Sequence, residues 1–306
     1  MHTPKTAGHM DKFSGMWAFV KTAELGSFVA AGRALAISAS AVGKGVARLE
    51  QEVGVRLLQR STRRIQLTAE GNLFYERCRR ILDDLDDAQA MLSLSREAPR
   101  GRLRVSAPIV GYHFLIPLVP EFLARHPEVE LDINFSDRAV DLIDEGIDVA
   151  IRSGDLRDSR LVSRPLQAFR LLLCAAPAYL TRHGTPVAMR DLELHACVRF
   201  RHPDSGKLLD WPWRENLDSP EPRLRTVLAC NNIEAVLGAT LRGLGIACLP
   251  DFLVRDALAD GRLVSVLEQD MGPSRQFRAL WPSSRHLSPK VRVFVDHLGA
   301  QLSGPP

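Results

Sequence analysis

The stretch from residue 24 to residue 50 constrains the fold more than any other part of the chain, because it predicts two short helices joined by a tight turn. Gly26 can adopt the left-handed conformation that ends the preceding helix, and Ser27 can cap the next helix by accepting a backbone N–H bond. Residues 36–37 make the turn, and Ser38 caps the second helix. The pattern predicts a helix-turn-helix.

The second of these helices has one apolar face and one polar face. Its apolar residues recur in steps of four, three and four, close to the helical period: Val42, Val46, Leu49 and Val53. The opposite face carries small, polar and basic side chains: Ser40, Ala41, Lys44 and Arg48. A recognition helix presents such side chains to the major groove of DNA. A capped helix pair with a purely structural role is the alternative for this stretch taken by itself.

A two-stranded wing is predicted directly after the second helix, over residues 54–71. Three arginines fall at its tip: Arg60, Arg63 and Arg64. Basic side chains at such a tip can contact DNA phosphates or the minor groove. With the caps and Arg33 of the first helix included, the candidate DNA-binding residues are Ser27, Arg33, Ser38, Ser40, Ala41, Lys44, Arg48, Arg60, Arg63 and Arg64.

The distribution of charge supports a nucleic-acid partner. Residues 1–65 contain ten Lys and Arg against four Asp and Glu, whereas the whole chain of 306 residues has a net charge of only +4. A basic N-terminal module on a near-neutral body is typical of a nucleic-acid reader with a separate sensing part. A solvated basic face without a partner is the alternative.

A long helix is predicted over residues 69–96, with Thr68 as its cap and Glu70 in its first turn. Its apolar residues follow steps of four and three, the seam of a coiled coil: Phe74, Cys78, Ile81, Leu85, Ala88 and Leu92. The rest of its surface is very polar, which favours a dimerisation helix over packing against its own domain. A proline and a glycine in residues 97–101 break the helix and predict a hinge.

Strand and helix patterns alternate after the hinge. Strands are expected at 103–106, 129–135 and 149–152, with helices at 114–125 and 140–145 between them. Further strands are expected at 196–201, 223–229, 245–249 and 277–281, and further helices at 232–241 and 289–301. This order predicts an α/β domain with a mainly parallel sheet and helices on both faces.

About sixty residues of the N-terminal part resemble the LysR-type transcriptional regulators. The matching residues are Ser27-Phe28, Ala31, Leu35, Ser38 to Val42, Leu49-Glu50, Gly54 to Leu58, Arg60 and Leu67 to Gly71. The resemblance implies an α+β multi-domain chain. Its expected parts are a disordered extension (1–10), a winged helix-turn-helix (11–68), a linker helix that dimerises (69–96), a hinge (97–101) and a two-lobed α/β effector domain (102–306) similar to periplasmic binding proteins. Lobe I is expected at 102–169 and 272–306, and lobe II at 170–271.

The resemblance also implies a function. It predicts a cytoplasmic regulator that is not an enzyme, binds promoter DNA as a dimer or tetramer, and responds to a small-molecule effector without a cofactor, metal or membrane. A solute-binding protein for transport is one alternative, but no apolar signal sequence follows the N-terminus and the basic module does not fit it. A DNA-binding protein without an effector is the other.

Five residues are candidates for effector binding. Ser106 ends the first strand of the effector domain, where its hydroxyl and the following amides can hold a carboxylate. The resemblance places Ser106 at an effector-contacting position and assigns Ser136, Arg152, Arg199 and Asn232 to the same cleft. Helix capping is the alternative role for Ser106, and an ion pair to Asp148 or Asp155 is the alternative for Arg152. An anion is the expected effector class, and neutral effectors remain possible.

Other motifs give weaker indications. The glycines near residue 243 lack a phosphate-loop pattern, the histidines lack metal spacing, and no GxSxG elbow surrounds Ser106. Five widely spaced cysteines form no disulfide or zinc pattern, so reduced core thiols are expected. Core packing is favoured over an aromatic ligand box for Trp211-Pro212-Trp213.

Two glycines, Gly43 and Gly45, stand in the predicted recognition helix where LysR-type regulators often carry hydroxyl or polar residues. Each helical glycine costs about 1 kcal/mol relative to alanine. They either weaken the helix or let its backbone approach DNA more closely, and the sequence leaves this choice open.

Overall fold

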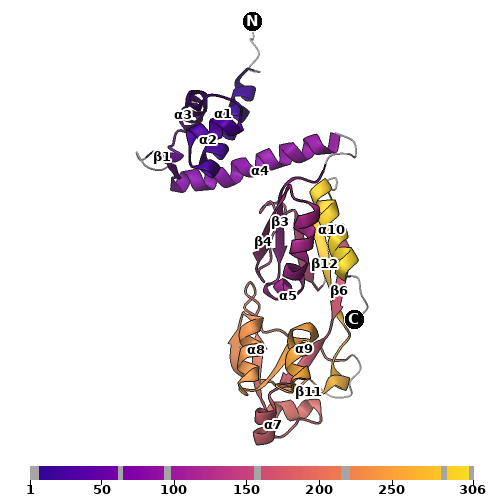
Figure 1. The fold of residues 1–306 in the computed structure, drawn as a ribbon. Coiled ribbons are helices and arrows are strands. Elements are labelled where there is room, and N and C mark those ends of the chain that lie inside the picture. The colour runs from indigo at the N-terminus through magenta and orange to yellow at the C-terminus, as the bar shows by residue number, and fades with distance from the viewer. Residues whose placement is uncertain are drawn as a thin grey trace. The chain divides into compact units, whose positions relative to one another are not determined.

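The computed structural model describes residues 7–60, 65–92, 98–154, 160–214, 221–283 and 288–302. The chain divides into two compact units between residues 96 and 97. Figure 1 shows a helical first unit and a second unit built on two sheets. Within the described residues, no helix is both long enough and apolar enough to cross a membrane.

The first unit begins with three helices, α1 (Ala7–Leu25), α2 (Phe28–Ala34) and α3 (Ala39–Val53). The expectation of disorder through residue 10 is therefore wrong for residues 7–10, which belong to α1. No proline stands between Ala7 and Asp11 to stop the helix, and extending an existing helix costs far less free energy than nucleating one.

The predicted caps of the helix-turn-helix are confirmed. The Ser27 hydroxyl accepts the Ala30 N–H at 3.3 Å, and the Ser38 hydroxyl accepts the Ala41 N–H at 3.1 Å. Gly26 has a φ of +61°, the left-handed conformation expected at the end of α1. The turn before α3 is also tight, because a β-carbon at Gly32 would lie 2.8 Å from the carbonyl oxygen of Ile37.

The core of the first unit combines residues from every helix. Its buried members are Ala18, Phe19, Val20, Ala31, Val42, Val46, Leu49, Leu57, Leu58, Cys78 and Leu82. Val53, predicted to lie on the apolar face of the second helix, is exposed instead, as are Phe13 and Leu25 of α1. Leu25 and Val53 are the last residues of α1 and α3, and Phe13 lies in the N-terminal half of α1.

The wing consists of β1 (Leu58–Arg60) and β2 (Ile65–Leu67), an antiparallel pair. Its first strand is fixed to α3, because the Glu50 carboxylate accepts the backbone N–H groups of Leu57 at 2.8 Å and Leu58 at 3.0 Å. The predicted tip arginines Arg63 and Arg64 lie outside the described residues.

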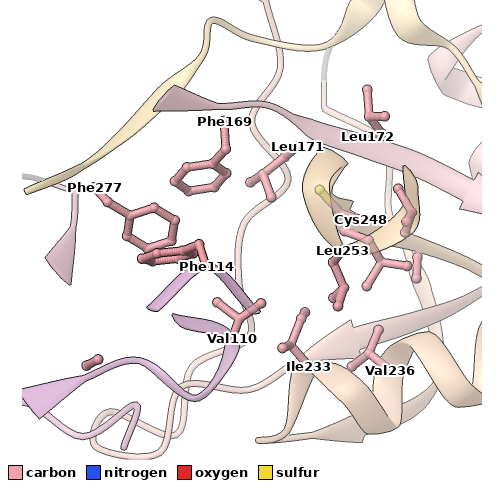
Figure 2. Packing of buried hydrophobic residues seen from close by; sticks show 14 of the residues in the cluster. Val110, Phe114, Phe169, Leu171, Leu172, Ile233, Val236, Cys248, Leu253 and Phe277 are labelled. Carbon is pink, nitrogen blue, oxygen red and sulfur yellow. The ribbon is translucent and has the colours of Figure 1, made fainter. Parts of the chain in front are cut away.

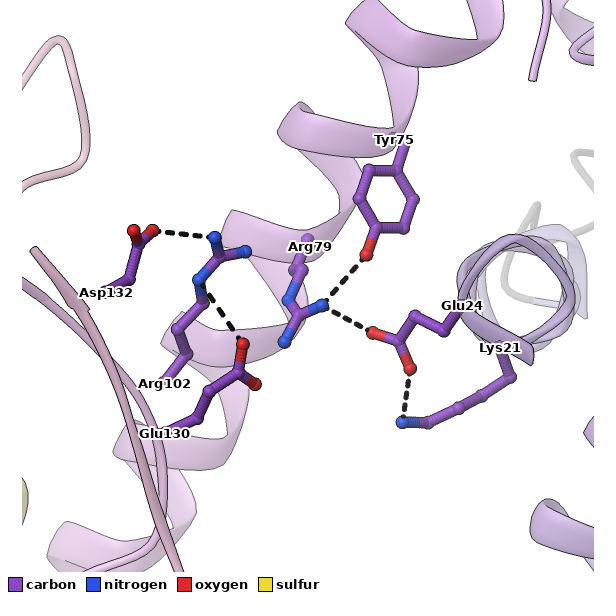
Figure 3. A network of polar contacts seen from close by, with 7 residues as sticks. All are labelled: Lys21, Glu24, Tyr75, Arg79, Arg102, Glu130 and Asp132. Carbon is purple, nitrogen blue, oxygen red and sulfur yellow. Dashed lines mark hydrogen bonds and ion pairs between the residues drawn. The ribbon is translucent and has the colours of Figure 1, made fainter. Parts of the chain in front are cut away.

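The long helix α4 (Ala69–Leu92) is capped by Thr68, whose hydroxyl accepts the Gly71 N–H at 2.8 Å. Part of its predicted seam packs within the unit: Cys78 is buried and Phe74 packs against the same core. Figure 3 shows Arg79 of α4 donating to Glu24 of α1 at 2.8 Å. The seam predicted for a partner is thus partly occupied by α1, and residues 93–96 of the predicted helix lie outside the described residues.

The first sheet of the second unit has the strand order β4-β3-β5-β12-β6. Its strands are β3 (Gly101–Ala107), β4 (Val129–Phe135), β5 (Val149–Ser153), β6 (Leu161–Phe169) and β12 (Arg275–Pro282). The pairs β3–β4 and β3–β5 are parallel, whereas β12 runs antiparallel to both β5 and β6. Gly101, assigned to the hinge, instead opens β3, where its N–H donates to the Glu128 carbonyl at 3.0 Å.

The second sheet has the strand order β11-β7-β10-β8-β9. Its strands are β7 (Leu171–Ala175), β8 (Ala196–Phe200), β9 (Arg225–Cys230), β10 (Ile246–Pro250) and β11 (Val264–Val266). The helices α7 (Pro177–His183), α8 (Ile233–Leu241) and α9 (Asp251–Ala259) accompany it, and α10 (Pro289–Leu302) packs against β6 of the first sheet (Figure 1). The chain crosses to this sheet at Arg170 and has returned by Arg275.

Two predicted helices differ from the structure. The helix expected at 114–125 is divided into α5 (Tyr112–Leu115), a 3₁₀ turn (Ile116–Leu118) and α6 (Val119–Arg125), since Pro117 and Pro120 provide no N–H for a continuous helix.

The helix expected at 140–145 is only a turn. The Asp141 carboxylate accepts the N–H groups of Ile143 at 2.9 Å and Asp144 at 3.1 Å, and Gly146, with a φ of +65°, ends the turn. One turn is therefore all that this segment forms.

The aromatic and thiol residues mostly belong to the cores. Trp211 is buried and Trp213 packs against the same core, as predicted. All five cysteines are free thiols, and all except Cys230 are buried. Burial raises the pKa of Cys78 and Cys174 to about 12 and that of Cys197 to about 11, so these thiols stay protonated and unreactive.

Candidate functional site

The exposed face of α3 is the first candidate site. The four residues predicted to point outward, Ser40, Ala41, Lys44 and Arg48, are all exposed. On the other face, the first three of the predicted apolar residues are buried, at 5% exposure or less. Arg48 lies 3.5 Å from the Glu52 carboxylate, one helical turn further on. The structure therefore displays a small, polar and basic surface on a helix that is held firmly from behind.

The other candidate DNA-binding residues occupy the edges of this surface. Ser27 and Ser38 use their hydroxyls as helix caps, and Arg33 is exposed on α2. Arg60 is the last residue of β1, at the start of the wing turn.

The two unusual glycines of α3 have different surroundings. Gly45 faces α1, where a β-carbon would lie 3.5 Å from the Ala18 β-carbon and 3.9 Å from the Gly15 α-carbon. Gly43 has no described atom within 4 Å of that position. Gly45 therefore serves the close crossing of α1 and α3, whereas half-buried Gly43 has room for a β-carbon.

A cavity of about 230 Å³ between the two sheets of the second unit is the second candidate site. Its walls come from both sheets and from the loops beside them. The lining residues are Pro108, Val110, Ser136, Asp137, Arg152, Ser153, Phe169, Leu171, Phe200, His202, Leu209, Ile233, Cys248, Pro250, Arg275 and Phe277.

Aromatic side chains form one wall of this cavity. Phe169 and Phe277 stack on neighbouring strands with ring centroids 4.6 Å apart, and Phe114 lies 4.9 Å from Phe277 behind them. Figure 2 shows this aromatic group beside Leu171, with Val110 and Ile233 below it and Cys248 further along. The cavity thus offers a flat apolar wall together with a few polar groups, as small-molecule sites usually do.

The five predicted effector residues are only partly brought together. Ser136 and Arg152 line the cavity, but Ser106, Arg199 and Asn232 are absent from its lining. Ser106 is fully buried, and its hydroxyl accepts a hydrogen bond from Arg152 at 2.7 Å rather than capping a helix.

Arg199 and Asn232 have structural partners instead. The Arg199 guanidinium donates to the Leu209 carbonyl at 2.8 Å and lies 3.9 Å from Asp210. The Asn232 side chain caps α8 by accepting the N–H of Glu234 at 2.9 Å. Their strand and helix positions were predicted correctly, but their side chains are used by the fold.

Arg152 is the most constrained polar group of the cavity. Besides Ser106, its guanidinium donates to the carbonyls of Ile151 at 2.7 Å and Arg138 at 3.4 Å. Burial lowers the pKa of Arg152, while the nearby Asp137 carboxylate opposes this effect. Burial also raises the pKa of Asp137, which accepts the Ile109 N–H at 3.0 Å.

Two polar contacts join the sheets beside the cavity. His113 of α5 lies 2.7 Å from the Glu234 carboxylate at the start of α8. The Ala139 N–H donates to Asp204 at 2.5 Å. Each contact joins a segment of lobe I to a segment of lobe II.

Several lining residues were not predicted from the sequence. Asp137, His202, Cys248 and Arg275 carry the remaining charged or titratable groups of the cavity. Arg275 stands at the beginning of a strand whose apolar pattern was recognised only from residue 277. Nothing local in the sequence shows that this strand end faces the same space as Arg152.

Two family models match the chain. One, described as "Bacterial regulatory helix-turn-helix protein, lysR family", matches residues 14–72, and the other, described as "LysR substrate binding domain", matches residues 96–303. The first match covers the helix-turn-helix and wing, and the second covers both sheets that line the cavity.

Relatives match along almost the whole chain. The HTH-type transcriptional regulator CrgA of Neisseria meningitidis serogroup C is 37% identical over 286 residues, covering 93% of this chain and 95% of its own. The HTH-type transcriptional regulator PtxR of Pseudomonas aeruginosa is 34% identical over 293 residues, covering 95% and 93%.

Solved structures match over a similar length. CrgA from Neisseria meningitidis, described as a LysR-type transcriptional regulator, gives a TM-score of 0.62 at 33% identity and covers 95% of this chain and 99% of its own. The full-length Vibrio cholerae virulence activator AphB gives a TM-score of 0.54 at 28% identity and covers 93% and 97%.

Proposed function

We propose that this chain, which belongs to the LysR family of transcriptional regulators, binds promoter DNA through α3 and the wing and is controlled by a small molecule held in the cavity between its two sheets. The family membership makes it a transcriptional regulator with a helix-turn-helix and an effector-binding domain. We assign no catalytic reaction to it, and we place its action in the cytoplasm, together with the promoter DNA.

The DNA-binding proposal is supported by the division of α3 into a buried and an exposed face. Lys44 and Arg48 carry the charge that phosphates or guanine edges attract, while Ser40 is small enough to let the helix approach the bases. Arg48 shares its charge with Glu52, so Lys44 is assigned the stronger contact. The wing arginines, Arg60, Arg63 and Arg64, are assigned to the backbone or the minor groove.

The effector proposal is carried by one observation, the 230 Å³ cavity whose walls come from both sheets. A ligand that contacts both sheets favours the arrangement of the two lobes in which it makes more contacts. It can shift the equilibrium between two arrangements only by the difference in its affinity for them. Such a shift provides a way for a small molecule to change how the protein holds DNA.

Self-association is proposed through α4. Ile81 and Leu85 are 47% and 37% exposed, and their separation of four residues places them on one side of the helix. A second copy would bury this stripe, whereas Phe74 and Cys78 serve the unit's own core. Sedimentation of the full chain should show that Leu85→Asp, which places a charge in the stripe, dissociates the dimer; an unchanged oligomer would assign the contact elsewhere.

Thermal-shift screening of metabolites tests the effector proposal. A ligand at a hundred times its dissociation constant stabilises the folded protein by about 2.7 kcal/mol. Leu209 lines the cavity and is only partly buried, so Leu209→Trp should fill the space without disturbing the core. We expect a ligand found with wild type to lose its thermal shift in Leu209→Trp. An equal shift in both proteins would place the effector outside the cavity.

A further inference from the structure

The two arginines that line the cavity are engaged to very different extents. Arg152 already donates to a hydroxyl and two carbonyls and lies in the field of Asp137. A ligand carboxylate that bound to Arg152 would have to share the Arg152 guanidinium with the Asp137 carboxylate and the Ser106 hydroxyl. Arg152 is therefore mainly a structural cation of the cavity wall.

Arg275 is the other cationic side chain of the cavity. It opens β12, where its backbone is paired with Phe169, and its side chain is only partly exposed. Among the residues that the structure describes, none provides a hydrogen bond or an ion pair to its guanidinium. It shares the cavity lining with Cys248, whose protonated thiol cannot neutralise a cation. An anionic ligand therefore gains more binding free energy from this partly desolvated, unpaired charge than from a guanidinium that is already paired.

The rest of the cavity limits the kind of anion. Its apolar wall contains the stacked rings of Phe169 and Phe277, which suit a flat hydrocarbon body. The volume of about 230 Å³ corresponds to roughly eight water molecules at about 30 Å³ each, or a ligand of about ten non-hydrogen atoms. Asp137 lies on the same lining and repels a second negative charge. These features fit one charged group on a compact apolar body.

We propose that the effector is a compact, flat monoanion, with a carboxylate as its simplest form, that pairs with Arg275 and packs its apolar body against Phe169 and Phe277. The inference rests on the proposed function of the cavity as the effector site. It names Arg275 as the anchoring residue and an aromatic monocarboxylate as the ligand class.

The test uses two probes of equal shape, 4-fluorobenzoate and the uncharged 4-fluorobenzamide, observed by ¹⁹F NMR with the full-length protein. Wild type should bind the carboxylate about tenfold or more tightly than the amide, the ratio expected for a charge-assisted hydrogen bond. Arg275→Gln should remove this preference, and Arg275→Lys should restore part of it. Arg278→Gln is the matched control, because Arg278 lies on the same strand but donates outward to Ser163 at 3.4 Å.

The inference is wrong if wild type binds neither probe up to its solubility limit, if it binds both equally, or if Arg275→Gln keeps the preference. Leu209→Trp separates this failure from that of the proposed function. If Leu209→Trp abolishes the thermal shift of screened ligands while Arg275→Gln leaves carboxylate preference intact, the cavity is the effector site and only the anchor is wrong. If neither variant changes any binding, the cavity assignment itself fails.

Discussion

The exposed face of α3 and the cavity of the second unit both present basic side chains, but the fold uses them differently. On α3, Lys44 points away from a core that Val42 and Val46 hold in place from behind. In the cavity, Arg152 binds Ser106 and two backbone carbonyls, so the same side chain lines the site and supports its wall. Replacing Lys44 should therefore leave stability unchanged, whereas removing the Arg152 side chain should not.

The largest expected effect follows from the double role of Arg152. Arg152→Ala leaves the fully buried Ser106 hydroxyl without its partner, which should lower the free energy of unfolding of the second unit by about 2–3 kcal/mol. Arg278→Ala, which removes only a 3.4 Å hydrogen bond to Ser163 from the neighbouring strand, should change it by less than about 0.5 kcal/mol. Urea unfolding followed by fluorescence measures both. Equal stability of Arg152→Ala and wild type would remove the distinction between the two sites.

Lys44 provides the matching test on α3. Lys44→Ala should weaken promoter binding by about 1–3 kcal/mol if the side chain contacts a base, and should leave stability within about 0.5 kcal/mol of wild type. A contact to phosphate alone would instead give a uniform loss and a shallower salt dependence. Fluorescence anisotropy at two salt concentrations distinguishes these cases, and wild-type affinity at both would remove Lys44 from the DNA surface.

A pH effect on stability is expected in the second unit. His195 is buried beside Tyr179, whose hydroxyl lies 3.2 Å from its Nδ1 atom, and burial lowers the pKa of His195 below its usual 6.5. The unfolded chain therefore binds a proton at a higher pH than the folded chain does. Stability from this group is full above about pH 6.5 and is lost as the pH falls toward the folded pKa, at no more than about 1.4 kcal/mol per pH unit.

Denaturant unfolding between about pH 7 and pH 5.5 measures this loss, in a range above the usual carboxylate titrations. His195→Gln should flatten the dependence, and His202→Gln, at an exposed position of the cavity rim, should keep it. A flat profile for wild type would show that His195 is protonated equally in both states.

The smallest expected effect concerns Gly43 of α3. Gly43→Ala meets no described atom within 4 Å, so it should stabilise the first unit by about 0.5–1 kcal/mol through helix propensity. Any accompanying loss of promoter affinity would show that the missing β-carbon lets α3 approach DNA. Thermal unfolding and anisotropy on the same variant separate the two roles, and lower stability would contradict the open surroundings of Gly43.

The helix-turn-helix could be predicted because its signals are local. Caps at Ser27 and Ser38 and the spacing of Val42 and Val46 lie within a few residues of the structure they specify. Local periodicity gave a wrong prediction at 114–125, where one continuous helix was expected but prolines divide it.

The cavity could not be predicted in the same way, because its lining depends on long-range strand pairing. Arg275 lines the cavity because β12 lies between β5 and β6 in the sheet. In the chain, β12 is more than a hundred residues away from both of these strands. The family resemblance assigned five residues to one cleft, of which Ser136 and Arg152 line the cavity. It could not indicate that the side chains of Ser106, Arg199 and Asn232 are used for internal hydrogen bonds.

The central claim is that a small molecule in the cavity changes how the protein binds promoter DNA. The most direct measurement is the promoter affinity of the full-length protein with and without a ligand found by thermal shift, in wild type and in Leu209→Trp. We expect the ligand to change the affinity or the DNA bend of wild type and to have no effect on Leu209→Trp, although both proteins bind DNA equally without ligand. The same ligand response in both proteins would contradict it.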